Sequence, residues 1–326
     1  MAGNALPRWR GFNLLEMFHT RSDCQWREDD FRWIADWGFD FVRLPMCYLL
    51  WVEDGDPYRP REDALARIDQ AVEWGGRYGL HVNLNVHRAP GYSVNPERQE
   101  PYNLWRDAEA LEAFCSQWEL FANRYRGVSP QRLSFNLVNE PTNPNPEHMT
   151  REDHERVMRE AVRRIRAVDP ERLIILDGLT WGNDPCPELA DLGVGQSTRA
   201  YAPMTVSHYK ASWVNGERFA LPTWPGAEGW DRSRLEAHYA PWGQLVQQGV
   251  GVHCGEGGAF RFTPHEVVLA WLREVLEILT GYGIGLALWN FRGSFGVLDS
   301  EREDVAYEDW HGHQLDRKLL ELLQEF

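Results

Sequence analysis

Two short apolar stretches of the sequence each end in a glutamate, and together they could supply a pair of buried carboxyl groups. Residues 133–139 lead into Glu140 and then Pro141, which cannot continue a strand ladder. Residues 250–254 precede Glu256, which is flanked by glycines that permit an unusual backbone. Burial at a strand end raises the pKa of a carboxyl group, as a general acid requires. Either glutamate alone could simply cap a loop, but paired carboxylates are the recurring apparatus of glycoside hydrolysis.

The elements that must position these glutamates alternate between apolar strands and amphipathic helices. Apolar residues recur at helical spacing in residues 61–78 and alternate strictly in residues 80–86. Strands joined by crossover helices run parallel, so eight such units predict a single α/β domain over residues 1–326, a (β/α)8 TIM barrel. A doubly wound open sheet is the alternative. The expected strands are residues 9–15, 39–44, 80–86, 133–139, 172–176, 203–207, 250–254 and 284–289, and the main expected helices are 28–37, 61–78, 107–125, 151–168, 234–248, 263–280 and 314–323.

The ends of the expected strands are dense in polar and aromatic side chains, although the strands themselves are apolar. In a barrel of this kind the active site lies at the C-terminal ends of the strands. Taken one at a time, these residues have ordinary structural explanations, such as an ion pair or a core histidine. Their convergence predicts a functional site built from Arg43, His87, Asn139, Glu140, His208, Tyr209, Glu256 and Trp289.

These motifs together resemble glycoside hydrolase family 5, the cellulase family, whose members are retaining (β/α)8 enzymes with two strand-end glutamates. The Asn-Glu-Pro element is highly specific in this strand context, whereas an isolated Asn-Glu-Pro would not be. The matching pieces span nearly the whole chain: Arg10-Gly11-Phe12-Asn13, Val42-Arg43-Leu44-Pro45, Asn139-Glu140-Pro141, His208-Tyr209, Gly255-Glu256 and Leu288-Trp289-Asn290.

The resemblance implies a role for each of the central residues. Glu140 would be the acid/base and Glu256 the nucleophile. Asn139 would bond the sugar 2-hydroxyl group and orient its neighbour. Arg43 would keep Glu256 ionised, because a nearby cation favours the charged form of a carboxyl group.

The resemblance also implies supporting residues, with one departure from the family pattern. His208 and Tyr209 would position the carboxylates. The family, however, usually places its tyrosine two residues after this histidine, and here Lys210 takes that place. Tyr209 is therefore a weaker assignment than His208. The expected sugar contacts are His87, Trp289 and, after the fifth strand, Trp181.

Composition excludes several other classes of protein. The formal net charge is −15 and no basic run stands out, so we expect neither nucleic acid nor a membrane as a partner. No apolar run reaches the 18 residues of a membrane span. The first residues lack the apolar core of a secretion signal. Five scattered cysteines fit a reducing cytoplasm, although a removed signal peptide would leave the same start. We expect a monomer without a cofactor.

Two rival functions follow from the same residues. A metal-dependent barrel hydrolase would need a histidine cluster at the strand ends, for which only His87 and His208 are candidates. His311 and His313 have a ligand-like spacing, but they lie in a region expected to be helical and on the surface. No metal site is therefore expected. A carbohydrate-binding barrel without activity would have lost a glutamate or its partners, and these are all present.

The substrate is expected to be a β-linked oligosaccharide or polysaccharide. Aromatic side chains spread over several loops favour an open groove, and hence an endo-β-1,4-glucanase acting on cellulose-like or mixed-linkage β-glucans. An exo-acting β-mannosidase or β-glucosidase, or a β-mannanase, is the alternative, because the loop 212–231 could close one end of a groove. About half of the loop aromatics would pack the loops themselves. They are Tyr48, Trp51, Tyr58, Tyr92, Tyr102, Trp105, Trp213, Trp224 and Trp230.

Overall fold

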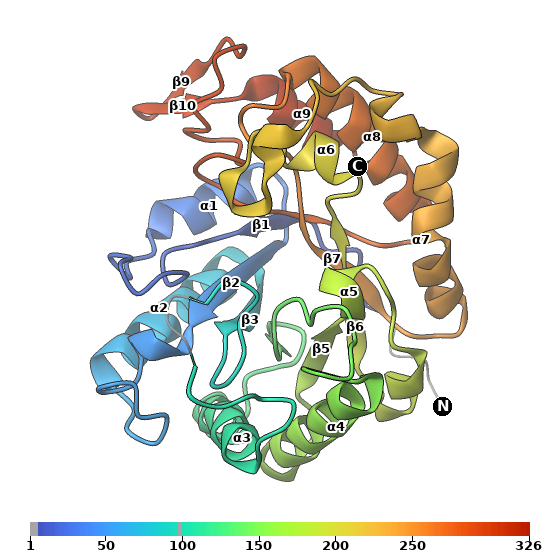
Figure 1. Ribbon diagram of the computed structural model, residues 1–326. Helices are drawn as coiled ribbons and strands as arrows, with labels where there is room; N and C mark the ends of the chain where they lie inside the picture. Colours follow the sequence, from blue (N-terminus) through green and yellow to red (C-terminus); the bar gives the residue numbers. More distant parts are fainter. Residues whose placement is uncertain (1–5, 97–99) are drawn as a thin grey trace.

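Eight parallel strands form a nearly closed barrel in the computed structural model, which describes residues 6–96 and 100–326 (Figure 1). The hydrogen-bonded order is β7-β6-β5-β4-β3-β2-β1-β8, and a parallel bridge between Cys254 and Leu286 joins the two ends of that order. The predicted TIM barrel is therefore confirmed. The strands are β1 Gly11–Asn13, β2 Phe41–Cys47, β3 His81–Arg88, β4 Leu133–Asn136, β5 Leu173–Asp177, β6 Gly195–Ala200, β7 Val252–Gly257 and β8 Ala287–Leu288.

The long helices form an outer ring around these strands (Figure 1). The α4 helix shows how the sequence sets a boundary, because Thr150 and Asp153 cap its first turn reciprocally. The helices are α1 Glu28–Asp36, α2 Glu62–Tyr78, α3 Ala108–Arg124, α4 Arg151–Val168, α7 Arg232–Gln247, α8 His265–Gly281 and α9 Arg317–Glu325, with single turns at α5 Leu179–Gly182 and α6 Met204–Ser207.

Toward the C-terminal strand ends the interior of the barrel is polar, above a small apolar cluster around Phe41, whereas the space between strands and helices is apolar. Asn83 and Ser134 are paired neighbours on β3 and β4, and the amide of Asn83 donates to the Ser134 hydroxyl at 2.8 Å. Asn85 donates in the same way to the Asn136 carbonyl at 3.2 Å. Because inward-facing strand positions carry polar groups, these groups must bond to one another. The barrel interior is therefore a hydrogen-bonded scaffold beneath the strand ends.

The predicted sixth strand is wrong. Residues 203–207 contain the short helix α6, and the sixth strand is β6, Gly195–Ala200. All six residues of β6 are buried, yet the segment reads as polar. Its side chains find partners inside the fold: Gln196 bonds both backbone groups of Cys186, and Thr198 donates to the Gly182 carbonyl. Apolar alternation could not reveal a strand whose polar groups are satisfied in this way.

The region around His311 is also not helical. It is an antiparallel hairpin of β9 (Glu308–Trp310) and β10 (His313–Leu315) that precedes α9. His313 bonds the Asp299 carboxylate at 2.7 Å, and His311 stacks on Trp33. Within residues 6–96 and 100–326, no group of three or more His, Cys, Asp or Glu side chains is arranged to hold a metal ion.

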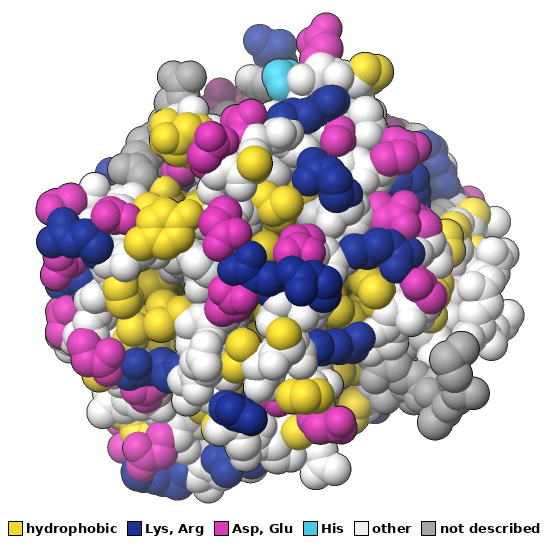
Figure 2. Space-filling view, turned by 90° about the horizontal axis from the view of Figure 1, so that it is seen from below, with side chains coloured by type: hydrophobic (Ala, Val, Ile, Leu, Met, Phe, Trp, Pro, Cys, Tyr) yellow, Lys and Arg dark blue, Asp and Glu magenta, His cyan; other side chains and the backbone are white. Residues whose placement is uncertain are grey.

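The outer face formed by α3 and α4 mixes charges of both signs. Figure 2 shows basic and acidic side chains interspersed there, without a large field of one sign. Arg164 pairs with Glu112 and Glu119 across the two helices, and Arg163 pairs with Glu160 along α4. The charges of the two signs therefore largely compensate one another on this face. Among the helices in the described ranges, none is both long and apolar enough to span a membrane.

Candidate active site

Glu140 lies just beyond β4 on a backbone that few residues other than glycine adopt, with a φ of 48°. Two groups outside its own segment hold this conformation. The Asp177 carboxylate, at the end of β5, accepts the Glu140 backbone N–H at 2.9 Å, and the Tyr92 hydroxyl donates to the Glu140 carbonyl at 2.6 Å. Strained backbone of this kind persists only where the surroundings over-determine it, and it is concentrated at functional sites.

Glu256 lies on β7, and its side chain is almost fully buried with a partner on each carboxylate oxygen. Arg43 of β2 donates to Oε1 at 2.6 Å, and the Tyr201 hydroxyl donates to Oε2 at 3.1 Å. Burial and the negative charge of Glu256 hold the pKa of Tyr201 well above its usual range, so this hydroxyl keeps its proton. Glu256 is thus fixed in orientation by a cation on one side and a neutral donor on the other.

The side-chain amide of Asn139 is oriented by two arginines. Its Oδ1 accepts from Arg43 Nη2 at 2.8 Å and from Arg199 Nη2 at 3.0 Å. Both donors fix the oxygen, so Nδ2 must point the other way. In the described part of the chain, this buried Nδ2 has no hydrogen-bond partner. An unpaired buried donor on the residue next to Glu140 is suited to a substrate hydroxyl group.

Arg199 and Asp177 complete the site, and sequence reasoning missed both. Arg199 Nε donates to Glu140 Oε1 at 3.0 Å, and its Nη2 pairs with Asp177. Nη2 also lies 3.4 Å from Glu256 Oε1. The arginine was missed because it belongs to β6, which the apolar pattern did not detect. Asp177, the last residue of β5, was detectable only as a charged residue ending an apolar run.

The charges of the site balance when Glu140 is protonated. Arg43 and Arg199 then oppose the carboxylates of Asp177 and Glu256. Burial, followed by the negative charge of Glu256, raises the pKa of Glu140 to about 8, and the nearby Arg199 limits the increase. The two glutamates therefore have different environments: one favours a neutral acid, and the other has a cation bonded to its carboxylate.

The raised pKa of Glu140 predicts the alkaline limit of activity. If Glu140 must donate a proton, kcat/KM on unactivated glycosides is expected to fall about tenfold per pH unit above about pH 8, where the acid form is lost. A pH profile of kcat/KM, with circular dichroism at each pH to check folding, measures this limit. An activated aryl glycoside is the control, because its departure needs no proton. A limit near pH 4–5 would contradict the assignment.

His87 and Trp289 lie together, and the backbone of Trp289 adjoins the strand that carries Glu256. Their rings stack with centroids 5.6 Å apart, and Phe18 contacts both rings edge-on. Burial and the neighbouring Arg43 hold the pKa of His87 well below its usual range, so the ring is neutral. Trp289 is half-buried, and its backbone N–H donates to the Gly257 carbonyl next to Glu256. A partly exposed aromatic face at this place can stack on a sugar.

His208 and Tyr209 do not make the contacts expected of them. The neutral His208 ring bonds the Ser207 hydroxyl and packs edge-on against Tyr201. The described contact of Tyr209 is with Lys210. Tyr201 takes the predicted place on Glu256, because α6 carries residues 204–208 away from the strand end. The useful signal was the Arg199-Ala200-Tyr201 spacing, in which arginine stands where the resemblance expects histidine.

Trp181 lies beside the loop that carries Glu140. Its backbone N–H donates to the Pro141 carbonyl at 2.9 Å, and its side chain is 43% exposed. Thr180 and Trp181 both adopt positive φ, at 53° and 56°. Because two consecutive left-handed residues are costly, the surrounding structure must hold this turn. The predicted sugar contact is therefore exposed and near the acid, on a fixed backbone.

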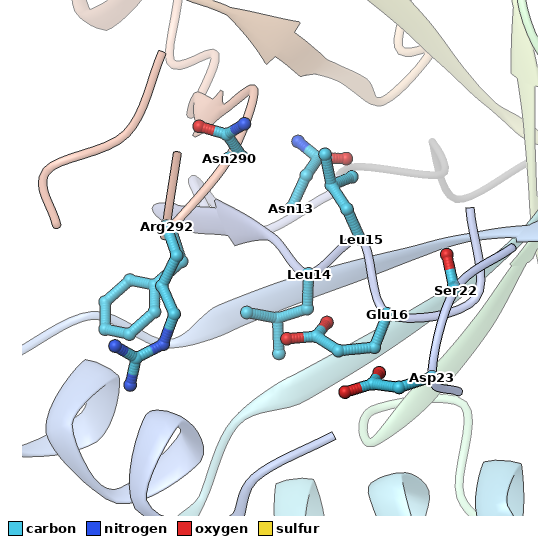
Figure 3. Close-up of a pocket in the computed structure, with 9 residues that line it drawn as sticks. Asn13, Leu14, Leu15, Glu16, Ser22, Asp23, Asn290 and Arg292 are labelled. Carbon is cyan, nitrogen blue, oxygen red and sulfur yellow. The ribbon is translucent and has the colours of Figure 1, made fainter. Parts of the chain in front are cut away.

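A pocket of about 250 Å³ opens at the ends of β1 and β8 (Figure 3). Glu16 and Asp23, from the segment after β1, and Arg292, after β8, line it. Burial and the charge of Asp30 raise the pKa of Glu16 to about 8, so this carboxyl group is neutral at pH 7. In the described ranges, Glu16 Oε2 has no partner. A protonated Glu16 can both donate and accept a hydrogen bond at the wall of this pocket.

The fold and site define a class of protein: a parallel (β/α)8 glycoside hydrolase with paired glutamates at its strand ends. The family model for cellulase, glycosyl hydrolase family 5, matches residues 2–294. The chain therefore belongs to this family and is an O-glycosyl hydrolase of the cellulase type.

Two curated relatives and a solved structure each align with most of the chain. Endoglucanase C of Acetivibrio thermocellus is 26% identical over 311 residues, which cover 86% of this chain and 88% of that protein. Cellodextrinase A of Ruminococcus flavefaciens is 28% identical over 269 residues, which cover 79% of this chain and 76% of that protein. A solved glycoside hydrolase structure is 40% identical with a TM-score of 0.93, covering 98% of this chain and 99% of that one.

Proposed function

We propose that this protein is a retaining endo-β-1,4-glucanase that acts on cellulose-like or mixed-linkage β-glucans. The observation that carries the proposal is the pair of glutamates in contrasting environments. Glu140 is an acid with a raised pKa, whereas Glu256 is bonded to Arg43 and Tyr201. This contrast is what a double displacement requires, since the acid must hold a proton and the nucleophile must not. One catalytic domain, residues 1–326, would carry the activity.

Each contact of the site has a place in that reaction. Glu256 would attack the anomeric carbon while Glu140 gives its proton to the leaving oxygen. The free Nδ2 of Asn139 would bond the 2-hydroxyl group of the reacting sugar. Trp289 would stack on that sugar, with His87 behind it. In the second step Glu140 would take a proton from a water molecule whose oxygen attacks the anomeric carbon. The bond to Glu256 then breaks, and the sugar is released with its original configuration.

The choice of β-glucan rests on two kinds of support. The relatives named above are an endoglucanase and a cellodextrinase. The exposed loop aromatics can also act as platforms for further sugars. About half of the loop aromatics do pack the loops, as expected: Tyr48, Trp51, Tyr92 and Trp105 are buried, whereas Tyr58, Tyr102 and Trp213 are each more than half exposed.

An exo-acting β-mannosidase or β-glucosidase is the second candidate, and one feature favours it. Trp213, at the start of the loop 212–231, packs edge-on against Phe260 with centroids 4.8 Å apart and also contacts His208. His208 in turn contacts Tyr201, the partner of Glu256. A loop so close to the nucleophile could close one end of a groove, as an exo enzyme needs.

Separate incubations with carboxymethylcellulose, barley β-glucan and an aryl β-mannoside test the proposal. We expect a rapid fall in viscosity with few new reducing ends on the two glucans, because an endo enzyme cuts within long chains. The Glu256→Gln variant, at the same protein concentration, controls for a contaminating activity. Release of monosaccharide alone, or activity confined to the mannoside, would overturn the proposed substrate in favour of the exo-acting candidate.

A further inference from the structure

Arg199 faces both glutamates of the site from the end of β6. Its side chain is 1% exposed. Nε donates to Glu140 Oε1 at 3.0 Å, and Nη2 lies 3.4 Å from Glu256 Oε1. Arg43, in contrast, pairs with Glu256 at 2.6 Å, and its described contacts do not include Glu140. Within the described chain, Arg199 is thus the cation common to both carboxyl groups.

Asp177 ties Arg199 to the backbone of Glu140. Its Oδ2 accepts from Arg199 Nη2 and from the Glu140 backbone N–H. Its Oδ1 accepts from the amide of Asn136 at 2.9 Å. The same ion pair therefore holds the main chain of Glu140 through Asp177 and its carboxyl group through Arg199. Because both charges are buried, loss of either partner would leave the other uncompensated.

The surrounding residues leave room for this particular side chain. A Cβ atom on Gly182 would lie 2.6 Å from Arg199 Cγ, and one on Gly255 would lie 3.1 Å from Arg199 Nη1. Nη1 donates to the Ser197 hydroxyl at 2.9 Å and to the Thr198 carbonyl at 3.1 Å. The guanidinium is thus bonded through all three of its nitrogens, which fixes its plane.

A double displacement, the proposed function on which this inference rests, moves one negative charge between the two carboxyl groups. In the first step, Glu256 gives an electron pair to the anomeric carbon. The C–O bond breaks toward the leaving oxygen, which takes the Glu140 proton. Glu256 is now a neutral ester and Glu140 is a carboxylate. In the second step, water gives its proton to Glu140 and its oxygen to the anomeric carbon, and Glu256 leaves as a carboxylate.

We propose that Arg199, held in place by Asp177, is a positioning residue that serves as the shared counter-ion of Glu140 and Glu256 in both steps. The guanidinium stays where it is while the negative charge passes from one of its neighbours to the other. Arg43 cannot follow this charge, because in the described chain it is bonded to the carboxylate of Glu256 and not to that of Glu140. Arg199 therefore matters most when Glu140 is a carboxylate, which is during release of the sugar.

The groups that face Glu140 fix the sign of the expected pH effect. Arg199 of β6 lowers its pKa, whereas Glu256 of β7 and Asp177 of β5 raise it. Tyr92, after β3, is neutral and contacts the backbone carbonyl. Removing the Arg199 charge should therefore raise the pKa of Glu140 both before and after formation of the covalent intermediate. Removing the Asp177 charge should lower it in both states.

The Arg199→Met variant tests this sign on two substrates. With a β-glucan oligosaccharide, the alkaline limb of kcat/KM is expected to move up by about one to three pH units. With an activated aryl β-cellobioside, the acidic limb of kcat is expected to move up as well, because Glu140 must be ionised to accept the proton of water. At neutral pH, kcat and KM for the aryl substrate should fall together, and intact mass spectrometry should detect accumulated glycosyl-enzyme.

Three further variants separate positioning from a merely structural role. Asp177→Asn should move both limbs down, and Arg199→Lys should restore part of the wild-type profile. Arg172→Met is the matched control: Arg172 is also buried and pairs with an aspartate at 2.8 Å, but it immediately precedes β5, at the opposite end of the barrel. Loss of the Arg172 charge should lower the melting temperature without moving either limb of the pH profile. If Arg199→Met does not fold, the Asp177→Asn and Arg199→Lys profiles decide.

Two results would overturn the inference, and they differ in what else they overturn. In the first, a 2-fluoro cellobioside labels wild-type Glu256, but neither limb of the pH profile moves in folded Arg199→Met and Asp177→Asn. This result would refute the shared counter-ion alone. In the second, the wild-type enzyme cleaves β-glucan but is not labelled, which would refute the double displacement and the shared counter-ion with it. Labelling together with limbs that shift in opposite directions in the two variants supports both.

Discussion

Replacing Glu256 with glycine is expected to reduce turnover of β-glucan by about 10⁵-fold or more, because the variant lacks the nucleophile of the first step. Arg43 and Tyr201 hold the two carboxylate oxygens of Glu256, and glycine leaves no carboxylate at that place. Turnover of barley β-glucan measures the loss. The melting temperature of the variant should be measured alongside turnover, since the change removes one partner of a buried ion pair and is expected to lower stability.

Added azide should restore cleavage of an activated aryl β-glycoside by Glu256→Gly, with an α-glycosyl azide as the product. A small anion can occupy the vacated position beside Arg43 and attack from the side that Glu256 used. Glu256→Gln is the matched control, since it removes the charge and leaves no space, so azide should not rescue it. A β-glycosyl azide would instead identify Glu256 as the acid/base and reverse the two assignments.

Replacing Glu140 with alanine is expected to lower kcat/KM on β-glucan oligosaccharides by about 10²- to 10⁴-fold, the usual contribution of a general acid. For a dinitrophenyl glycoside, kcat/KM should change by less than about tenfold, because that leaving group departs without a proton. The difference between the two substrates is the measurement. Equal losses on both would refute the role of Glu140 as an acid.

The backbone at Glu140 requires its own control. Its φ of 48° is costly for alanine but not for glycine, so Glu140→Ala could also disturb the loop. Glu140→Gly relieves that strain and should give the same contrast between leaving groups. A contrast seen with alanine but not with glycine would point to a displaced loop and away from loss of the acid.

The alternation of strands and helices was readable from the sequence because it follows from local patterns. Residues 80–86 alternate apolar and polar positions, and the corresponding strand is β3. Residues 151–168 show apolar positions at helical spacing, and the corresponding helix is α4. Glu140 and Glu256 were found because each ends an apolar run. The structure brings both together with the predicted Arg43 and Asn139, through contacts that Arg43 makes to Glu256 and to Asn139.

The sequence by itself thus determined the barrel, the two glutamates and several of their neighbours, but tertiary structure decided how the glutamates are held. Arg199 belongs to β6, a strand without an apolar pattern, and Tyr201 follows that strand. Asp177 is the last residue of β5. The physical reason is the polar interior of the barrel. A strand can be fully buried and still carry glutamine, serine and arginine if groups outside the strand satisfy them. Gln196 finds its partner at Cys186, and Arg199 finds its partners at Glu140 and Asp177, so no pattern within the strand itself could reveal them.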